Sequence, residues 1–393
     1  MALEPSVEDC LVGARVALTQ CLGVKGTEKV MIVQSPTSPS SRSLIRANRI
    51  LWWYRHCGHS SSELEEMTAK LVKRRDKIAT ALKTVCLEKG CGVSFYSIDT
   101  STMLNADFKW ESKEIAQRVL RDLSNADVLI DLTLFGLDEI PAPGMSRLHT
   151  FTSLRQELLQ GGKLRGADMH IVSDKSFAGG AMCADYQTLA KEVATLEGIV
   201  KMSRTLDIVT NKGTDLRIAI DPKQVFKGTG QICAAGEYHF LPSGIVSICL
   251  KKGAVSGKLV LDGPCYAVGT FSQFPLTLEI GSNGRIADVD LSEQAPYYDL
   301  VMNMFKMEEA HYPGELVFGL NPKGDPHSIQ PMEFYVARGT VSIALGRNDH
   351  IGGDIEPTSA GSVHVHASIT DATVENDHKQ IIVEKGQLKE VDK

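Results

Sequence analysis

The pattern of hydrophobic and polar positions changes once along the chain, near residue 205. Before that point, short apolar runs bounded by turn residues alternate with longer segments whose apolar positions recur at helical spacing. Strands that alternate with helices predict a doubly wound α/β domain built on a parallel sheet. The predicted strands lie at 29–34, 93–98, 128–133 and 169–172, and the predicted helices at 5–22, 44–88, 114–123 and 185–202.

Beyond residue 205, short runs of alternating apolar and polar residues dominate, separated by Gly, Asn or Asp turns such as 281–284. This pattern is typical of antiparallel sheet, and one helix is expected within it, at 298–309. We therefore predict an N-terminal doubly wound α/β domain over residues 1–205 and a β-rich α+β C-terminal domain over residues 206–393. The predicted strands of the second domain lie at 207–211, 216–220, 245–248, 258–261, 276–280 and 285–289.

Composition narrows the class of protein. The 393 residues include 48 acidic and 42 basic side chains, for a net charge of -6. This balance argues against nucleic acid as a partner, because proteins that bind nucleic acid need a basic surface. No apolar run approaches the roughly 20 residues that span a bilayer. The acidic N-terminus lacks the features of a secretory signal, so we expect a cytoplasmic protein. The nine cysteines contain no Cys-x-x-Cys pair and are expected to be reduced structural thiols.

Histidine is the residue that points to chemistry, because six of the eleven histidines lie in the last 83 residues. His364 and His366 are separated by one residue. In a strand their side chains would point to one face about 7 Å apart, which suits two ligands of a single metal ion. The alternative is a pair of histidines on a solvated strand face, and the spacing alone does not decide between them.

A second group of candidate residues lies where the helical pattern of apolar residues ends, at Pro313 and Gly314. Pro313 and Gly314 break a helix, so His311 is expected at a turn and Glu315 at the start of a strand. Two or three histidines with one carboxylate from separate strands make up a mononuclear Fe(II), Mn or Zn site. The alternative for Glu315 is a buried or edge carboxylate paired with an arginine.

A third candidate is the pair Glu237 and His239, which share a face if they lie in a strand. His239 would then be an acid/base group or a residue that supports a metal ligand. A surface pair is the alternative. The chain shows no phosphate-binding loop, no dinucleotide-binding glycine pattern after a strand and no nucleophile elbow of the Gly-x-Ser-x-Gly type.

Several motifs follow one another in a fixed order, at 211–216 with its Gly-Thr-Asp sequence, 241–246, 315–322, 338–346 and 364–366. In this order they resemble the thermophilic leucyl aminopeptidase (aminopeptidase T) metallopeptidases and their dioxygenase relatives. The resemblance runs almost from end to end, and it implies a shared fold and a homo-oligomer. We place no counterpart of the segment 35–75 in the family, and the segment is a candidate oligomerisation element.

The peptidases of this family hold two metal ions, and this chain lacks several of the ligands that the resemblance would require. Ile245 and Ser342 stand where an acidic and a histidine ligand are expected, and His366 stands where an Asp is expected. Only Glu315 and His364 remain. Neither isoleucine nor a neutral serine replaces such donors, so we expect that the protein is not a peptidase.

The relatives that cleave 2,5-dihydroxypyridine use one Fe(II), and His311 and His364 match two of their ligands. His366 departs from their pattern, which leaves either three histidines or a carboxylate recruited from Glu315. The resemblance thus implies a mononuclear non-haem iron dioxygenase that cleaves the ring of a small hydroxylated aromatic or N-heterocycle, with O₂ as co-substrate. In this interpretation His311, His364 and His366 hold Fe(II), or else Mn or Zn, and His239 moves a proton.

Two alternatives remain open at this point. The first is a single-metal hydrolase on the same scaffold, in which the metal activates a bound water and Glu237 or Glu315 acts as the base. It predicts activity without O₂ and tolerance of Zn or Mn. The second is a non-catalytic homologue that has kept the fold, although the His-x-His sequence at a ligand position speaks against it.

Overall fold

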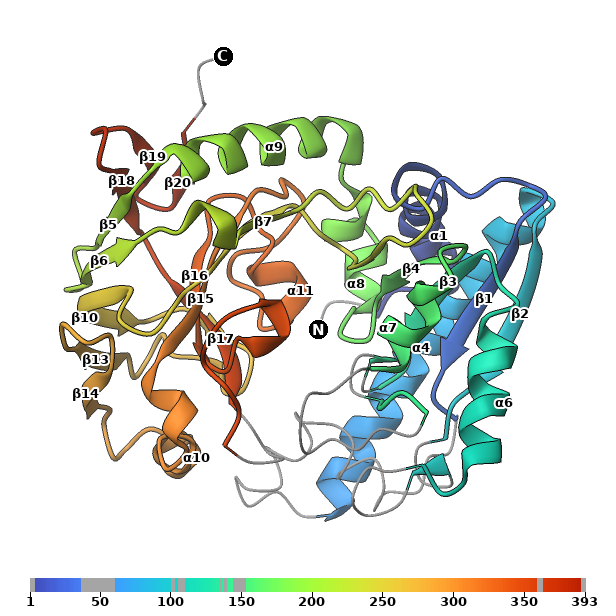
Figure 1. The fold of residues 1–393 in the computed structure, drawn as a ribbon, viewed down its shortest axis with the longest axis horizontal. Coiled ribbons are helices and arrows are strands. Elements are labelled where there is room, and N and C mark those ends of the chain that lie inside the picture. Colours follow the sequence, from blue (N-terminus) through green and yellow to red (C-terminus); the bar gives the residue numbers. More distant parts are fainter. Residues whose placement is uncertain are drawn as a thin grey trace. The chain divides into compact units, whose positions relative to one another are not determined.

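The computed structural model describes residues 4–36, 61–99, 103–104, 110–134, 136–137, 140–143, 153–358 and 363–389. Contacts divide the chain into two compact units (Figure 1). The first unit comprises Met1–Tyr186 and Gly230–Pro242, and the second comprises Gln187–Thr229 and Ser243–Lys393. Among the described residues, no helix is both long and apolar enough to cross a membrane.

This division differs from the single boundary that the sequence predicted between residues 205 and 206. Nearly all of helix α9 (Tyr186–Met202) belongs to the second unit, and the later segment Gly230–Pro242 returns to the first. The pattern of hydrophobic positions does not report such a return, because a three-residue strand is too short to show a period.

The first unit is built on a five-stranded parallel sheet with strand order β2-β1-β3-β4-β8. The predicted strands 29–34, 93–98 and 128–133 are confirmed to within a residue. Strands β1 and β3 are buried along their apolar stretches, which explains why their sequences are continuous apolar runs. The strands are β1 (Lys29–Gln34), β2 (Gly92–Ser97), β3 (Val128–Leu132), β4 (Arg165–Asp168) and β8 (Tyr238–Phe240).

The predicted strand at 169–172 is wrong, because the strand lies four residues earlier, at Arg165–Asp168. Asp168 ends it: the carboxylate accepts hydrogen bonds from the backbone N–H (2.9 Å) and the ring Nδ1 (2.5 Å) of His170. Such a local side-chain bond competes with the strand ladder and turns the chain. Of the apolar residues that follow, Met169 and Val172 are buried although they lie outside the strand.

Helices of the first unit begin where side-chain caps are available. Ser6 and Asp9 form a capping box at the start of α1 (Val7–Val16), and Ser112 caps α6 (Lys113–Leu123). The predicted helix 5–22 therefore starts as expected, but it ends in a π-helical turn. Of the predicted helix 44–88, residues 44–60 lie outside the described residues. The remaining elements are η1 (Ala17–Cys21), α4 (Ser61–Glu88), α7 (Leu154–Gln160), α8 (Asp174–Phe177) and η3 (Ala181–Cys183).

The second unit contains two antiparallel sheets, as the alternating pattern predicted. One has eight strands in the order β14-β13-β10-β6-β5-β18-β19-β20, and the other has seven in the order β12-β11-β17-β16-β15-β9-β7. The helix predicted at 298–309 ends earlier, at Met304, and a 3-10 turn follows. The strands of the larger sheet are β5 (Thr205–Val209), β6 (Asp215–Ala219), β10 (Val255–Leu261), β13 (Leu276–Ile280), β14 (Ile286–Asp290), β18 (Thr373–Asn376), β19 (Ile381–Glu384) and β20 (Gln387–Leu388).

One face of the seven-stranded sheet carries Glu315 and His366, and the opposite face carries apolar residues. Residues that pair across an antiparallel ladder share a face, and Glu315 pairs with Ala344, which pairs with His366. The neighbouring row of apolar residues around Ile343 faces the other way. The elements are β7 (Val225–Gly228), β9 (Ile245–Cys249), β11 (Pro264–Cys265), β12 (Gly269–Thr270), β15 (Pro313–Gly319), β16 (Val341–Gly346) and β17 (His364–Ile369), with η4 (Pro222–Gln224), α10 (Tyr298–Met304), η5 (Glu308–His311), α11 (Pro331–Phe334) and η6 (Asp349–Ile351).

The segment after α11 lies close against the end of β15, and Gly319 makes this approach possible. An added Cβ at Gly319 would lie 2.2 Å from the carbonyl oxygen of Ala337 and 2.8 Å from that of Tyr335. Backbone hydrogen bonds fix the approach, since Asn321 N–H donates to the Val336 carbonyl at 2.8 Å. A side chain at this position would therefore have to displace backbone.

We predict that Gly319→Ala destabilises the protein by about 1–3 kcal/mol, because overpacking against backbone cannot be relieved by rotating a side chain. Denaturant unfolding measures this change. The matched control is Gly198→Ala on α9, where no heavy atom of the described residues outside the helix backbone lies within 4 Å of the added Cβ. That variant should be stabilised by about 0.5–1 kcal/mol, since alanine favours a helix. Equal effects of the two substitutions would contradict the close approach at Gly319.

Candidate metal centre

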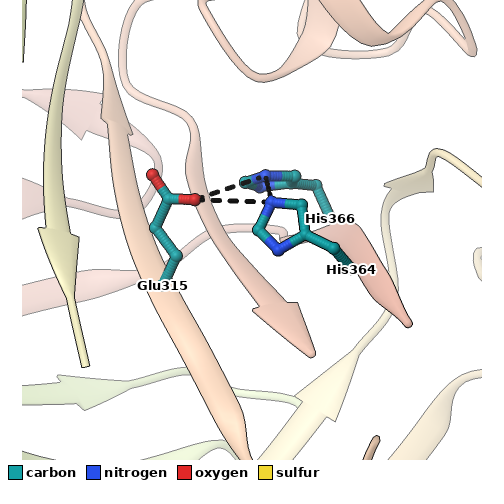
Figure 2. A group of neighbouring side chains, drawn as sticks. All are labelled: Glu315, His364 and His366. Atoms are coloured by element: carbon teal, nitrogen blue, oxygen red, sulfur yellow. Dashed lines mark hydrogen bonds and ion pairs between the residues drawn. The ribbon is translucent and has the colours of Figure 1, made fainter. Parts of the chain in front are cut away.

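Three side chains of the seven-stranded sheet bring donor atoms together (Figure 2). Glu315 comes from β15, and His364 and His366 come from β17, two strands away. The Nε2 atoms of the two imidazoles are 3.1 Å apart, and each lies 3.6 Å from the Oε2 atom of Glu315. The carboxylate therefore faces both ring nitrogens at once.

These spacings fit one metal ion. Two donors bonded to the same ion at about 2.1 Å lie about 3.0 to 3.6 Å apart when they subtend about 90 to 120° at the ion. The three measured separations fall within this interval. Two imidazoles and one carboxylate are also the donor set of mononuclear non-haem iron sites, and they suit Mn and Zn. Within the described part of the chain, Glu315, His364 and His366 are the group of His, Cys, Asp and Glu side chains arranged to hold an ion.

The ring of His364 is oriented by the backbone. Its Nδ1–H donates a hydrogen bond to the carbonyl oxygen of Arg347 at 2.8 Å. A carbonyl oxygen can only accept, so the proton of the neutral ring stays on Nδ1 and the lone pair lies on Nε2, toward Glu315. This is the arrangement that metal-binding histidines usually have.

The ring of His366 is kept neutral by its surroundings. Burial, and then the neighbouring His364, hold the pKa of His366 well below its usual value. A neutral imidazole is the form that binds a metal ion, since the protonated ring has no lone pair to offer. The site is therefore ready to bind a cation without first losing a proton from this residue.

Glu315 carries the charge of the site. Burial raises the pKa of its carboxyl group to about 7, and this rise is opposed by the hydroxyl of Ser247, which donates a hydrogen bond to Oε1. The buried carboxylate lacks a lysine or arginine partner among its ion-pair contacts in the described residues. A bound cation would supply the compensating charge that a buried carboxylate needs.

Comparison with known proteins agrees with this chemistry. Residues 109–390 match the family model described as 2,5-dihydroxypyridine 5,6-dioxygenase. The chain belongs to this family. The solved structure of 2,5-dihydroxypyridine dioxygenase from Pseudomonas putida KT2440 is similar in fold, with a TM-score of 0.66 and 16% sequence identity over 97% of each chain. No curated protein matches the chain.

Membership of the 2,5-dihydroxypyridine 5,6-dioxygenase family makes the protein a metal-dependent, ring-cleaving dioxygenase. It implies a small-molecule substrate, O₂ as the second substrate, and a metal cofactor such as iron. The link to the aminopeptidase T metallopeptidases rests on the sequence motifs alone.

His311, which the sequence predicted as a ligand, is not among the three grouped donors. It lies at the end of η5, where its Nε2–H donates to the carbonyl oxygen of Phe305 at 2.8 Å and its Nδ1 lies 3.3 Å from that of Ile286. The ring also packs edge-on against Phe305. Of the two ligand sets that the sequence left open, the structure groups the donors of the one with Glu315, and His311 as a ligand stays a prediction.

The predicted pair Glu237 and His239 lies in the first unit, whereas the three grouped donors belong to the second. Glu237 precedes β8 and its carboxylate accepts a hydrogen bond from the backbone N–H of Ala234 at 2.7 Å. His239 lies within β8 and is exposed. The structure places Glu237 in a local turn and His239 on a short parallel strand.

Three residues near the donors were not singled out from the sequence. Ser247 binds Glu315, the ring of Tyr335 stacks on His366, and the ring of His350 lies edge-on to His364 with 4.7 Å between centroids. A serine in a strand and an aromatic residue after a helix carry no sequence signal of their own. Only strand register and tertiary packing bring them to the site.

We predict that Glu315 makes the stability of the metal-free protein depend on pH. Its pKa is about 7 when folded, against 4.5 for an ordinary glutamate, so the stability it contributes below pH 4.5 is lost as pH rises through 7. Relative to the unsubstituted protein, the free energy of unfolding of Glu315→Gln should therefore rise by about 3 kcal/mol when the pH is raised from below 4.5 to above 7. Chemical unfolding of chelator-treated protein at pH 4.5 and pH 8 measures this difference.

Glu197 provides a control of opposite sign. Burial raises its pKa, but Lys201 and Lys227 outweigh this effect and hold the pKa below its usual value. Glu197→Gln should therefore lose stability relative to the unsubstituted protein as pH rises through the carboxylate range. A pH-independent difference for Glu315→Gln would mean that Glu315 ionises normally in the folded protein.

Proposed function

We propose that the protein is a mononuclear non-haem iron dioxygenase that opens the ring of a small hydroxylated aromatic or N-heterocycle of the 2,5-dihydroxypyridine type. The observation that carries the proposal is the group of His364, His366 and Glu315, whose donor atoms lie 3.1 to 3.6 Å apart in a member of this family. Ring cleavage follows from the family, and the proposal adds the identity of the metal, its ligands and the type of substrate.

The three side chains would hold Fe(II), and Mn or Zn are the other ions that this donor set accepts. When bound, the iron supplies open coordination positions and redox chemistry for the substrate and O₂. Glu315 contributes one negative charge in a buried place, which favours a divalent cation over a neutral ligand. His364 presents Nε2 because its Nδ1–H is bound to the Arg347 carbonyl.

Other residues have proposed roles that rest on the sequence. His239 is the proposed proton carrier, and Glu237 is the alternative base. His311 is the alternative third imidazole ligand. To act in this way, its Nε2 would have to give up the hydrogen bond to the Phe305 carbonyl, or its Nδ1 would have to turn from the Ile286 carbonyl.

Several broader features are part of the same proposal. We propose a cytoplasmic homo-oligomer without nucleic-acid or membrane partners, with a fold kinship to aminopeptidase T. We also propose that the chain divides into an N-terminal α/β domain and a β-rich domain that carries the metal site.

The function is tested by metal analysis of protein purified without oxygen, followed by O₂ uptake with 2,5-dihydroxypyridine and with catechol-like substrates. We expect about one iron per chain and O₂ consumption that requires it. His364→Ala and His366→Ala should each lower iron content at least tenfold, because each removes one of three donors. About one zinc per chain with activity in the absence of O₂ would favour the hydrolase, and no bound metal would favour the non-catalytic homologue.

Glu315→Gln and His311→Ala decide the third ligand. Glutamine keeps the size of the side chain and an oxygen atom but removes the negative charge, so iron affinity should fall at least tenfold. His311→Ala should leave iron content near one per chain, since the Nε2–H of His311 donates to the Phe305 carbonyl and its Nδ1 faces the Ile286 carbonyl. The reverse pattern, with iron lost in His311→Ala and kept in Glu315→Gln, would show a ligand set of three histidines.

A further inference from the structure

The two histidines of the metal centre are oriented by different means. The second ring nitrogen of His364 is bound to a backbone carbonyl, as described above. The corresponding Nδ1 atom of His366 is buried and has no hydrogen-bond partner among the described residues. Among the described residues, the ring of His366 is therefore contacted by polar atoms only at Nε2, which lies 3.1 Å from Nε2 of His364, and no hydrogen bond at Nδ1 orients it.

Stacking on Tyr335 takes the place of that hydrogen bond. The two rings are nearly parallel, with an interplanar angle of 17° and 5.5 Å between centroids. By contrast, His364 meets the ring of His366 edge-on, at 86°. A stacked contact limits rotation of the imidazole about its Cβ–Cγ bond, because rotation would push the ring edge into the phenol ring. This rotation decides whether Nε2 of His366 points at Glu315.

Tyr335 is itself held in place. Its side chain is buried, and its hydroxyl donates to the sulfur of Met332 in α11 at 3.2 Å. The backbone that follows Tyr335 is fixed to Asn321, two residues beyond β15: Asn321 N–H donates to the Val336 carbonyl, and Arg338 N–H donates to the Asn321 carbonyl at 2.9 Å. The phenol ring is therefore a rigid surface against which the imidazole can be positioned.

We infer that Tyr335 is the positioning residue for His366, and that its ring aims the imidazole Nε2 at the position of the metal ion. The inference rests on the proposed function, because it assigns Tyr335 a role at the same site. It makes metal affinity depend on the flat ring of Tyr335 and not on its hydroxyl group, since the hydroxyl is bound to Met332.

Cobalt binding tests the inference without any substrate. Metal-free protein is titrated with Co²⁺ in competition with a chelator, and the visible absorption of the bound ion reports its ligand environment. Tyr335→Leu, which removes the flat ring, should weaken Co²⁺ binding about tenfold and alter the spectrum, as loss of a residue supporting a metal ligand does. Tyr335→Phe keeps the ring and should bind Co²⁺ within about twofold of the unsubstituted protein.

Phe271→Leu controls for the loss of a buried aromatic ring. Phe271 is also buried in the second unit and stacks edge-on with Tyr297 and not with a donor residue. This variant should lose stability in chemical unfolding but keep its Co²⁺ affinity. If it weakens Co²⁺ binding as much as Tyr335→Leu does, the effect is one of general stability and the inference fails.

A double-mutant cycle with His366→Asp isolates the contact. An aspartate offers a carboxylate donor and has no ring to stack, so Tyr335→Leu should change Co²⁺ affinity by less than about twofold in that background. An unchanged tenfold loss there would overturn the inference. If His366→Asp binds no Co²⁺, the contrast between Tyr335→Leu and Tyr335→Phe decides.

Failure of this inference is distinct from failure of the proposed function. If the unsubstituted protein binds no metal, the proposed function itself is wrong. If it binds Co²⁺ and Tyr335→Leu binds it equally well with the same spectrum, the metal centre stands and only the role of Tyr335 is rejected.

Discussion

The candidate metal centre depends on the pairing register of three antiparallel strands. Glu315 pairs with Ala344 and Ala344 with His366, so an acidic and a basic donor from strands that are not adjacent lie on one face of the sheet. A slip of one residue in either ladder would turn one donor to the opposite face. The residue between them in this row is alanine, whose side chain is a single methyl group.

The same sheet makes the site electrostatically demanding. Burial disfavours the charged form of both groups. It raises the pKa of the Glu315 carboxyl group and lowers the pKa of the His366 imidazole. A divalent cation resolves this conflict, because it compensates the carboxylate and uses the lone pairs of both rings. The polypeptide thus holds a place whose groups are better satisfied with an ion than without one.

The resemblance to the dioxygenases was readable from the sequence, since short motifs in a fixed order survive where overall identity is only 16%. The assignment of His311 as a ligand also came from that order. In the structure the Nε2–H of His311 donates to the Phe305 carbonyl and its Nδ1 lies 3.3 Å from the Ile286 carbonyl, so His311 as a ligand stays a prediction. A motif records which residue types occur along the chain, but the partner of each side chain is set by what folds against it.

By itself, the sequence determined that the first half of the chain alternates helices and strands, that the second half is antiparallel sheet, and that His364 and His366 share a face. Each of these follows from a local period of side-chain directions. Only the tertiary structure brought Glu315 beside His364 and His366, returned Gly230–Pro242 to the first unit, and placed Ser247 against Glu315 and Tyr335 against His366. These contacts join residues far apart in sequence, whose meeting depends on strand order and packing and leaves no period in the chain.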